Sequence, residues 1–150
     1  MVAQSGTNVL FFFDSVSATL NNRRKLKRFI SSIFLSENKK FEAIHYVFTT
    51  DAALHQINTE YLNHDYYTDI ITFRLSENKH PIVADIYISI DRVRENALQL
   101  NTSFRTELHR VIFHGALHLC GYKDKTKGQR LVMRRKEDHY LAKYFGKRFT

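Results

Sequence analysis

The chain of 150 residues is 43% hydrophobic and 25% charged, which fits one globular domain large enough to bury a core. No apolar run approaches the ~20 residues that would span a bilayer, so we expect no membrane partner. A single cysteine excludes an internal disulfide, and residues 1–15 lack the basic start of a signal peptide. These features together predict a cytoplasmic location.

The charge is strongly basic, with 23 Lys and Arg against 15 Asp and Glu, a net charge of +8. Such a balance favours a polyanionic partner, because cationic side chains that neutralise phosphates release counterions. The basic residues cluster in segments 21–29 and 127–137. Both segments have helical patterns, so each could equally be the solvated face of an amphipathic helix.

The first half of the chain predicts two strands and two helices. Residues 9–15 form a short apolar run of strand formers, and residues 23–35 carry apolar side chains at helical spacings of three and four. A partly alternating strand follows at residues 43–50. It ends at Asp51, which we predict to be the N-cap of a helix running to about Asn63.

The second half predicts two strands followed by three helices. Strands at 68–75 and 82–89 flank a loop at 78–81, and helices follow at 91–100, 103–119 and 127–145. Cys120 and Gly121 end the second of these helices, and Gly146 ends the third. Because strands and helices do not strictly alternate, we predict a single α+β domain. Its small, mostly four-stranded mixed sheet would be covered by four to five helices.

The segment HGALHLCGYKD, residues 114–124, predicts a metal site. His114 and His118 are four residues apart, so a helix brings both imidazoles to one face with Cβ atoms about 6 Å apart. Gly121 ends the helix and turns the chain, and Asp124 then falls where it can supply a third ligand. Three protein ligands and one open position are typical of catalytic zinc.

Other interpretations of the neighbouring residues stay open. Cys120 or His139 could be the third ligand, although a small buried cysteine and an ordinary structural histidine are the favoured interpretations. His109 lies five residues before His114, on another helix face, and is not expected to bind the metal. Gly115 stands where a zinc protease would carry its glutamate, and it could instead allow another element to pack close to the helix.

This segment resembles the signature of the YbeY family of metal-dependent endoribonucleases, His-Gly-x-Leu-His-Leu-x-Gly-Tyr followed by Asp-His. Residues 67–73 (YTDIITF), 84–89 (ADIYIS) and 57–62 (INTEYL) resemble three further family segments, so the similarity spans residues 48–124. Seven residues match the signature directly: His114, Gly115, Leu117, His118, Leu119, Gly121 and Tyr122.

Two positions depart from the family pattern. Asp124 stands where the third zinc ligand is usually a histidine, and Leu62 replaces an arginine that the family uses at its active-site cleft. The loss of that arginine affects the expected binding of substrate phosphate. His64, Arg74 or a lysine are the candidate replacements.

The resemblance implies that residues 1–150 form a single metalloribonuclease domain with one Zn²⁺ per chain. His114, His118 and Asp124 would bind the zinc, and His114 would be the catalytic residue. The implied activity is single-strand-specific RNA cleavage by zinc-bound water, in ribosomal RNA maturation and ribosome quality control. The implied partners are ribosomal RNA precursor and the small ribosomal subunit or its proteins.

Several roles and two rival functions remain open. Asp69 and Asp85 could contact substrate or support local structure. Four tyrosines could stack on bases, namely Tyr61, Tyr66, Tyr67 and Tyr122, the last of which we expect to pack over the metal site. One rival function is a ribosome-associated RNA-binding protein with a structural zinc. The other is a zinc peptidase, which Gly115 argues against.

Overall fold

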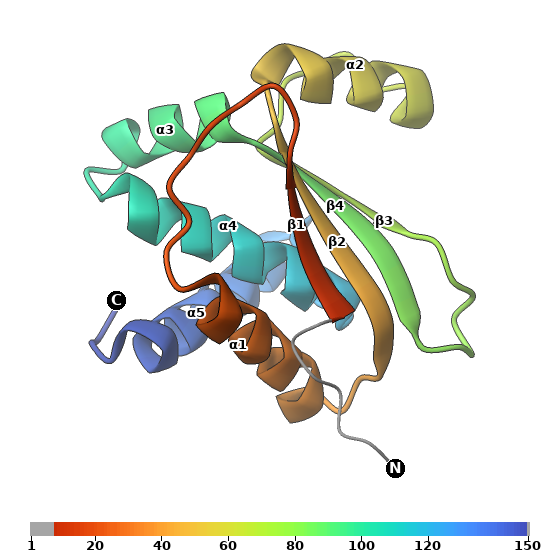
Figure 1. The fold of residues 1–150 in the computed structure, drawn as a ribbon, viewed down its shortest axis with the longest axis vertical. Helices are drawn as coiled ribbons and strands as arrows, with labels where there is room; N and C mark the ends of the chain where they lie inside the picture. Colours follow the sequence, from red (N-terminus) through yellow and green to blue (C-terminus); the bar gives the residue numbers. More distant parts are fainter. Residues whose placement is uncertain (1–7, 150) are drawn as a thin grey trace.

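The computed structural model describes residues 8–149, so residues 1–7 of the amino-terminal segment considered above lie outside the described part. The described residues form one mixed sheet and five helices (Figure 1), which confirms the predicted α+β fold. The sheet has the order β1 (Val9–Phe13), β2 (Phe41–Thr49), β4 (Ile82–Ser89), β3 (Ile70–Arg74). The first three are parallel, and β3 pairs antiparallel with β4.

The helices are α1 (Arg23–Ser36), α2 (Asp51–Leu62), α3 (Ile90–Gln99), α4 (Phe104–Leu119) and α5 (Lys127–Phe145). Their bounds lie within a few residues of the predicted ones, but the predicted N-cap of α2 was wrong. The hydroxyl of Thr50 accepts a hydrogen bond from the Ala53 N–H at 3.1 Å, and Asp51 is the first helical residue. The Asp51 carboxylate is instead paired with Arg92 of α3 at 2.8 Å.

One face of the sheet forms the core with the helices. Along β2 and β4 alternate side chains are fully buried, and these include Tyr46, Phe48, Ile86 and Ile88. The buried Tyr46 hydroxyl donates to the Ile112 carbonyl of α4 at 2.8 Å. Figure 1 shows α4 beside the sheet with α1, α3 and α5 around it, and α2 at one end of the strands. The core therefore holds α4 against the sheet.

Gly115 is the point where α4 comes closest to the sheet. A Cβ atom at this position would lie 3.0 Å from the Ile70 side chain and 3.1 Å from the Ile86 side chain. Such contacts are tighter than ordinary packing allows, so the close-packing interpretation of Gly115 is confirmed. Position 115 faces the sheet, and a glutamate there would have no room.

The chain reverses after α4 as the sequence predicted. Cys120 is the C-cap, and Gly121 has φ 106°, a left-handed conformation that favours glycine. Gly146 ends α5 with φ 69°. Among the described residues, no helix is long and apolar enough to cross a membrane.

Candidate metal centre

Three side chains that the sequence singled out converge beside the carboxyl end of α4. The Nε2 atoms of His114 and His118 each lie 3.3 Å from Oδ2 of Asp124. Candidate ligand atoms of the three residues all lie within 4.8 Å of one another. All three side chains are partly buried, Asp124 being the most exposed at 40%. The structure therefore brings the predicted ligand set together.

The other ring nitrogen of each histidine has its own hydrogen-bond acceptor. Nδ1 of His118 donates to the Tyr122 carbonyl at 2.8 Å, and Nδ1 of His114 donates to Oε2 of Glu137 at 2.6 Å. These acceptors lie closer to the rings than Asp124, whose Oδ2 is 3.3 Å from each Nε2, so a neutral ring with its proton on Nδ1 is favoured. The Nε2 lone pairs of both rings then point at Asp124.

Two nitrogen lone pairs and one carboxylate oxygen repel one another unless a proton or a cation lies between them. Burial disfavours the charged form of His114, but Glu137, Asp124 and Asp69 outweigh this effect and raise its pKa above the ordinary value. The centre thus attracts positive charge. A donor set of two imidazole nitrogens and one carboxylate oxygen fits a divalent cation such as Zn²⁺.

A second group of contacts holds the turn after α4. The partly buried Glu37 carboxylate, at the end of α1, accepts hydrogen bonds from Tyr122 (2.7 Å), Tyr140 and Lys136 (3.1 Å). Burial opposes the charged form of Glu37, but these three donors together lower its pKa. The Tyr122 ring is therefore directed at Glu37, and the expectation that it packs over the metal site was wrong. Only its carbonyl reaches the site.

The centre lies in a cleft between β3, the end of α2, α4 and α5. Leu62 lines this cleft, so the position of the expected family arginine does face the site. The three candidate replacements are there as well. His64, Arg74 and Lys125 line the same cleft, and Arg74 also donates to the His80 carbonyl at 3.0 Å.

The two aspartates of the matching segments differ in position. Asp69 lines the cleft, and its Oδ2 accepts from Asn96 at 3.4 Å. Burial raises its pKa above the ordinary value, although the nearby His114 opposes the shift. Asp85 is absent from the cleft lining and pairs with His45 of β2 at 3.2 Å. Asp69 alone of the two is close enough to the site to act there.

The alternative ligands lie outside the cluster found among residues 8–149. Cys120 is buried among apolar side chains, and burial raises the pKa of its thiol to about 12, as expected for a small buried hydrophobe. His139 is exposed, with its ring against Tyr140 at 4.9 Å. His109 is fully buried elsewhere on α4 and donates from Nδ1 to the Arg105 carbonyl.

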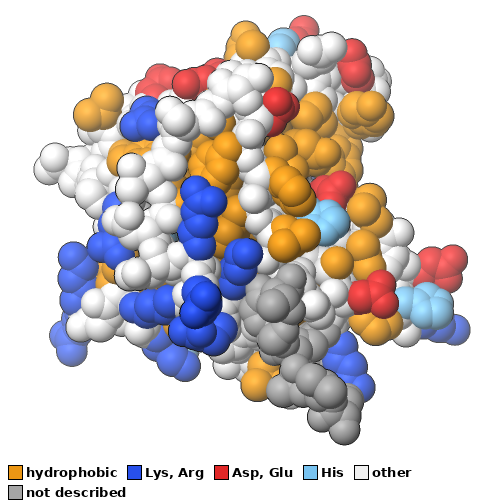
Figure 2. Space-filling view, in the orientation of Figure 1, with side chains coloured by type: hydrophobic (Ala, Val, Ile, Leu, Met, Phe, Trp, Pro, Cys, Tyr) orange, Lys and Arg blue, Asp and Glu red, His pale blue; other side chains and the backbone are white. Residues whose placement is uncertain are grey.

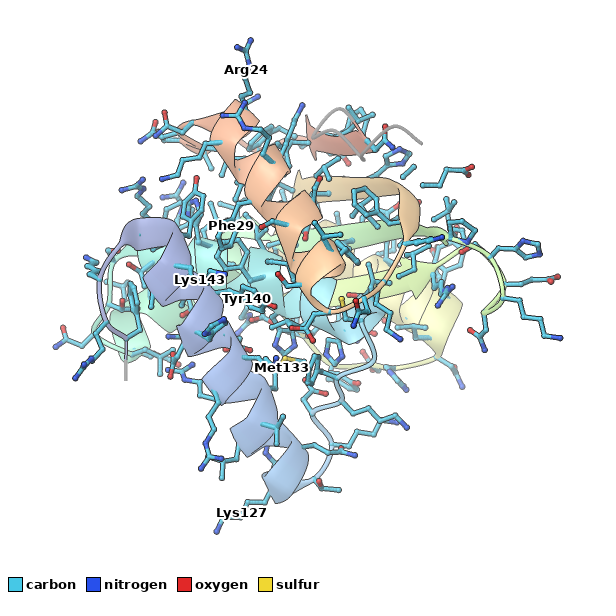
Figure 3. The ribbon with its side chains drawn as sticks, turned by 90° about the horizontal axis from the view of Figure 1, so that it is seen from below. Arg24, Phe29, Lys127, Met133, Tyr140 and Lys143 are labelled. Carbon is cyan, nitrogen blue, oxygen red and sulfur yellow. The ribbon has the colours of Figure 1, made fainter. Side chains whose placement is uncertain are left out.

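The basic segments are helical, and only the second contributes to the cleft. Figure 2 shows Lys and Arg side chains gathered where α1 and α5 lie. Arg24 and Lys127 point away from the helices, whereas Phe29 and Tyr140 face each other between α1 and α5 (Figure 3). Arg134 of α5 lines the cleft, and no residue of segment 21–29 does.

Two of the tyrosine side chains near the cleft stack on histidine rings. Tyr66 lines the cleft, is 55% exposed and stacks on His64 at 5.1 Å. Tyr67 stacks on His55 at 4.3 Å, and Tyr61 is 71% exposed. Tyr66 is thus the tyrosine best placed to meet a base.

Sequence reasoning missed two charged residues at the site, Arg110 and Glu137. Arg110 lies four residues before His114, so helical spacing could have identified it. Glu137 lies 23 residues after His114 and reaches it only because α5 packs against α4. No local pattern marks such a residue.

Three potential metal ligands that converge in an open cleft of an α+β fold are an arrangement typical of metal-dependent hydrolases. The family model described as Endoribonuclease YbeY matches residues 13–145. The chain belongs to this family of nucleases, which confirms the predicted resemblance and the hydrolase class.

Individual relatives agree with this assignment. An Endoribonuclease YbeY from Cytophaga hutchinsonii is 44% identical over 134 residues, which cover 89% of this chain and 94% of the relative. One from Flavobacterium psychrophilum is 53% identical over 112 residues, covering 75% and 79%. The solution structure of a Thermotoga maritima protein has a TM-score of 0.56 at 24% identity, covering 92% and 89%, and supports the fold.

Proposed function

We propose that this protein is a zinc-dependent, single-strand-specific endoribonuclease that acts on ribosomal RNA precursors. One Zn²⁺ per chain would be bound by His114, His118 and Asp124, and His114 would be the catalytic residue. The observation that carries the proposal is the convergence of both Nε2 atoms on Asp124 at 3.3 Å in an open cleft. Membership of an endoribonuclease family supports RNA as the substrate.

The residues around the centre would bind the phosphates and bases of the substrate. When bound, the cation would activate a water molecule and polarise a phosphoryl oxygen. His64, Arg74 and Lys125 line the cleft and would bind the substrate phosphates in place of the family arginine that Leu62 replaces. The ring of Tyr66 would stack on an unpaired base, which favours single-stranded RNA.

The enzyme is favoured over a protein with a structural zinc, because a closed zinc site needs four protein ligands. Among the described residues only three are grouped, while Cys120 and His139 lie outside the group. The peptidase alternative lacks its glutamate, and Gly115 is packed against Ile70 and Ile86, so that position has no room for one.

The biological setting is part of the same proposal. We propose roles in ribosomal RNA maturation and ribosome quality control, with the small ribosomal subunit or its proteins as partners; membership of an endoribonuclease family supports RNA as the substrate. A cytoplasmic location agrees with such substrates. We propose that residues 1–150 form the single metalloribonuclease domain that carries out these roles.

The test compares the cleavage of single-stranded RNA by zinc-loaded wild-type protein and by His114→Ala and His139→Ala variants. His139 is exposed and outside the centre, so its variant is a matched control for the loss of a histidine. We expect His114→Ala to lose on the order of a hundredfold or more in activity, and chelation to inactivate the wild type. Equal activity of wild type and His114→Ala would refute the proposal. Cleavage of peptides but not RNA would favour the peptidase.

A further inference from the structure

Glu137 connects the candidate metal centre to a chain of buried charges between α4 and α5. Its side chain is 7% exposed, and its two oxygens have different partners. Oε2 accepts from Nδ1 of His114 at 2.6 Å, and Oε1 accepts from Arg110 at 3.1 Å. The other end of the Arg110 guanidinium is paired with Asp138 at 2.8 Å. The order is therefore Asp138, Arg110, Glu137, His114.

We propose that Glu137 is the positioning residue of the metal centre and that Arg110 is its counter-ion. Glu137 would hold the His114 proton on Nδ1 and fix the ring, so that the Nε2 lone pair is directed at the cation. This inference rests on the proposed metal site. It assigns to Glu137 no contact with the substrate or with the cation itself.

The pattern of contacts fits an orienting role. Arginine–carboxylate pairs are frequently bidentate, with the guanidinium contacting both oxygens in a fork. Here Arg110 is shared between Glu137 and Asp138, which leaves one Glu137 oxygen for the histidine. Arg110 and His114 are four residues apart on α4, so the helix fixes the distance between them.

The two histidines are consequently unequal ligands. His118 donates to the neutral carbonyl of Tyr122, whereas His114 donates to an anion. A carboxylate acceptor makes the imidazole a more basic ligand than a carbonyl acceptor does. Arg110 at 3.1 Å and Arg134 at 3.8 Å both offset the charge of Glu137, so the centre gains this basicity without a second uncompensated anion beside Asp124.

The variant Glu137→Gln tests the proposal with little change of shape. The glutamate has an acceptor oxygen for each of two donors, His114 Nδ1–H and Arg110. A glutamine has one oxygen and one NH2 group in their place. One donor therefore loses its acceptor. We expect the metal-free His114 ring to shift toward the Nε2–H tautomer and the affinity for Zn²⁺ to fall about 10–100-fold.

The matched control is Asp138→Asn, which also removes a carboxylate from Arg110 but touches neither histidine. The readouts are ¹⁵N shifts of the His114 ring in metal-free protein at alkaline pH, and the Zn²⁺ dissociation constant from chelator competition. We expect Asp138→Asn to retain the wild-type tautomer and an affinity within about threefold of wild type. A structural role alone would lower affinity equally in both variants and leave the tautomer unchanged, which would overturn the proposal.

The wild-type spectrum provides a test that does not depend on any variant folding. We expect His114 to carry its proton on Nδ1, and a predominant Nε2–H tautomer in the wild-type protein would refute the proposal. Neither readout uses RNA. Absence of cleavage by the wild type would therefore count against the proposed function and leave the role of Glu137 standing.

Discussion

His109 gives the sharpest prediction, because it is a histidine buried among aromatic rings, where a charged imidazolium would be poorly solvated. It is 1% exposed and lies against the rings of Phe113, Tyr144 and Phe145. Burial lowers its pKa to about 4, the Arg105 and Lys25 charges add to this, and the hydrogen bond to the Arg105 carbonyl opposes it. His109 is thus neutral in the folded protein at neutral pH.

The magnitude follows from the difference between the folded and unfolded pKa values. In the unfolded chain a histidine titrates near 6.5, so the unfolded state binds this proton first as the pH falls. The contribution of neutral His109 to stability is complete above about pH 6.5 and is lost toward about pH 4. Each pKa unit corresponds to about 1.4 kcal/mol, so the loss is about 2–3 kcal/mol by about pH 4.5 and about 3–4 kcal/mol in full.

The assay is urea unfolding of wild type and of His109→Phe at about pH 7.5 and about pH 4.5. Phenylalanine suits the aromatic surroundings, and it removes a ring nitrogen, Nε2, that is buried without a hydrogen-bond partner. Other groups titrate equally in both proteins, so the difference between the two isolates His109. We expect wild type to lose about 2–3 kcal/mol more than the variant. Equal losses would refute the reasoning.

Two further predictions concern the centre itself. Gly115→Ala would gain about 1 kcal/mol of helix propensity but would crowd Ile70 and Ile86, which typically costs about 1–3 kcal/mol. We expect a net loss of about 1 kcal/mol in the free energy of unfolding, measured in urea. A more stable variant would mean that the two isoleucine side chains move aside without cost. Asp124→His would replace an anionic side chain with a neutral one at the proposed third ligand position, so the pKa that controls RNA cleavage should fall; a pH–activity profile with an unchanged or higher pKa would contradict this.

The elements of the fold were predictable because their signals are local. The i, i+4 histidines and the glycine after them located a helix, a turn and a candidate ligand set within eleven residues. The N-cap of α2 was not predictable, because Thr50 and Asp51 are both good caps. The choice depends on Arg92 of α3, which binds the Asp51 carboxylate from 41 residues away.

The surroundings of the centre were less predictable, because they depend on packing between elements. The aromatic ring of Tyr122 was expected over the metal site, but its hydroxyl donates a hydrogen bond to Glu37 at the end of α1. Glu137 contacts His114 from another helix, and the spacing of the two residues in the sequence does not indicate this contact. Arg110 is the one charged neighbour that helical spacing could have identified.

The family signature combines packing and chemistry on a single helix. Gly115 lets α4 press against β3 and β4, and this contact fixes where the next residues on the helix lie. His114 and His118 are then held at the cleft beside β3, with Nδ1 hydrogen-bonded and Nε2 facing Asp124. The left-handed Gly121 returns the chain so that one oxygen of Asp124 is equidistant from both Nε2 atoms, at 3.3 Å. The aspartate that departs from the family pattern therefore meets the geometric requirement of a third ligand, and it differs from a histidine mainly in its charge.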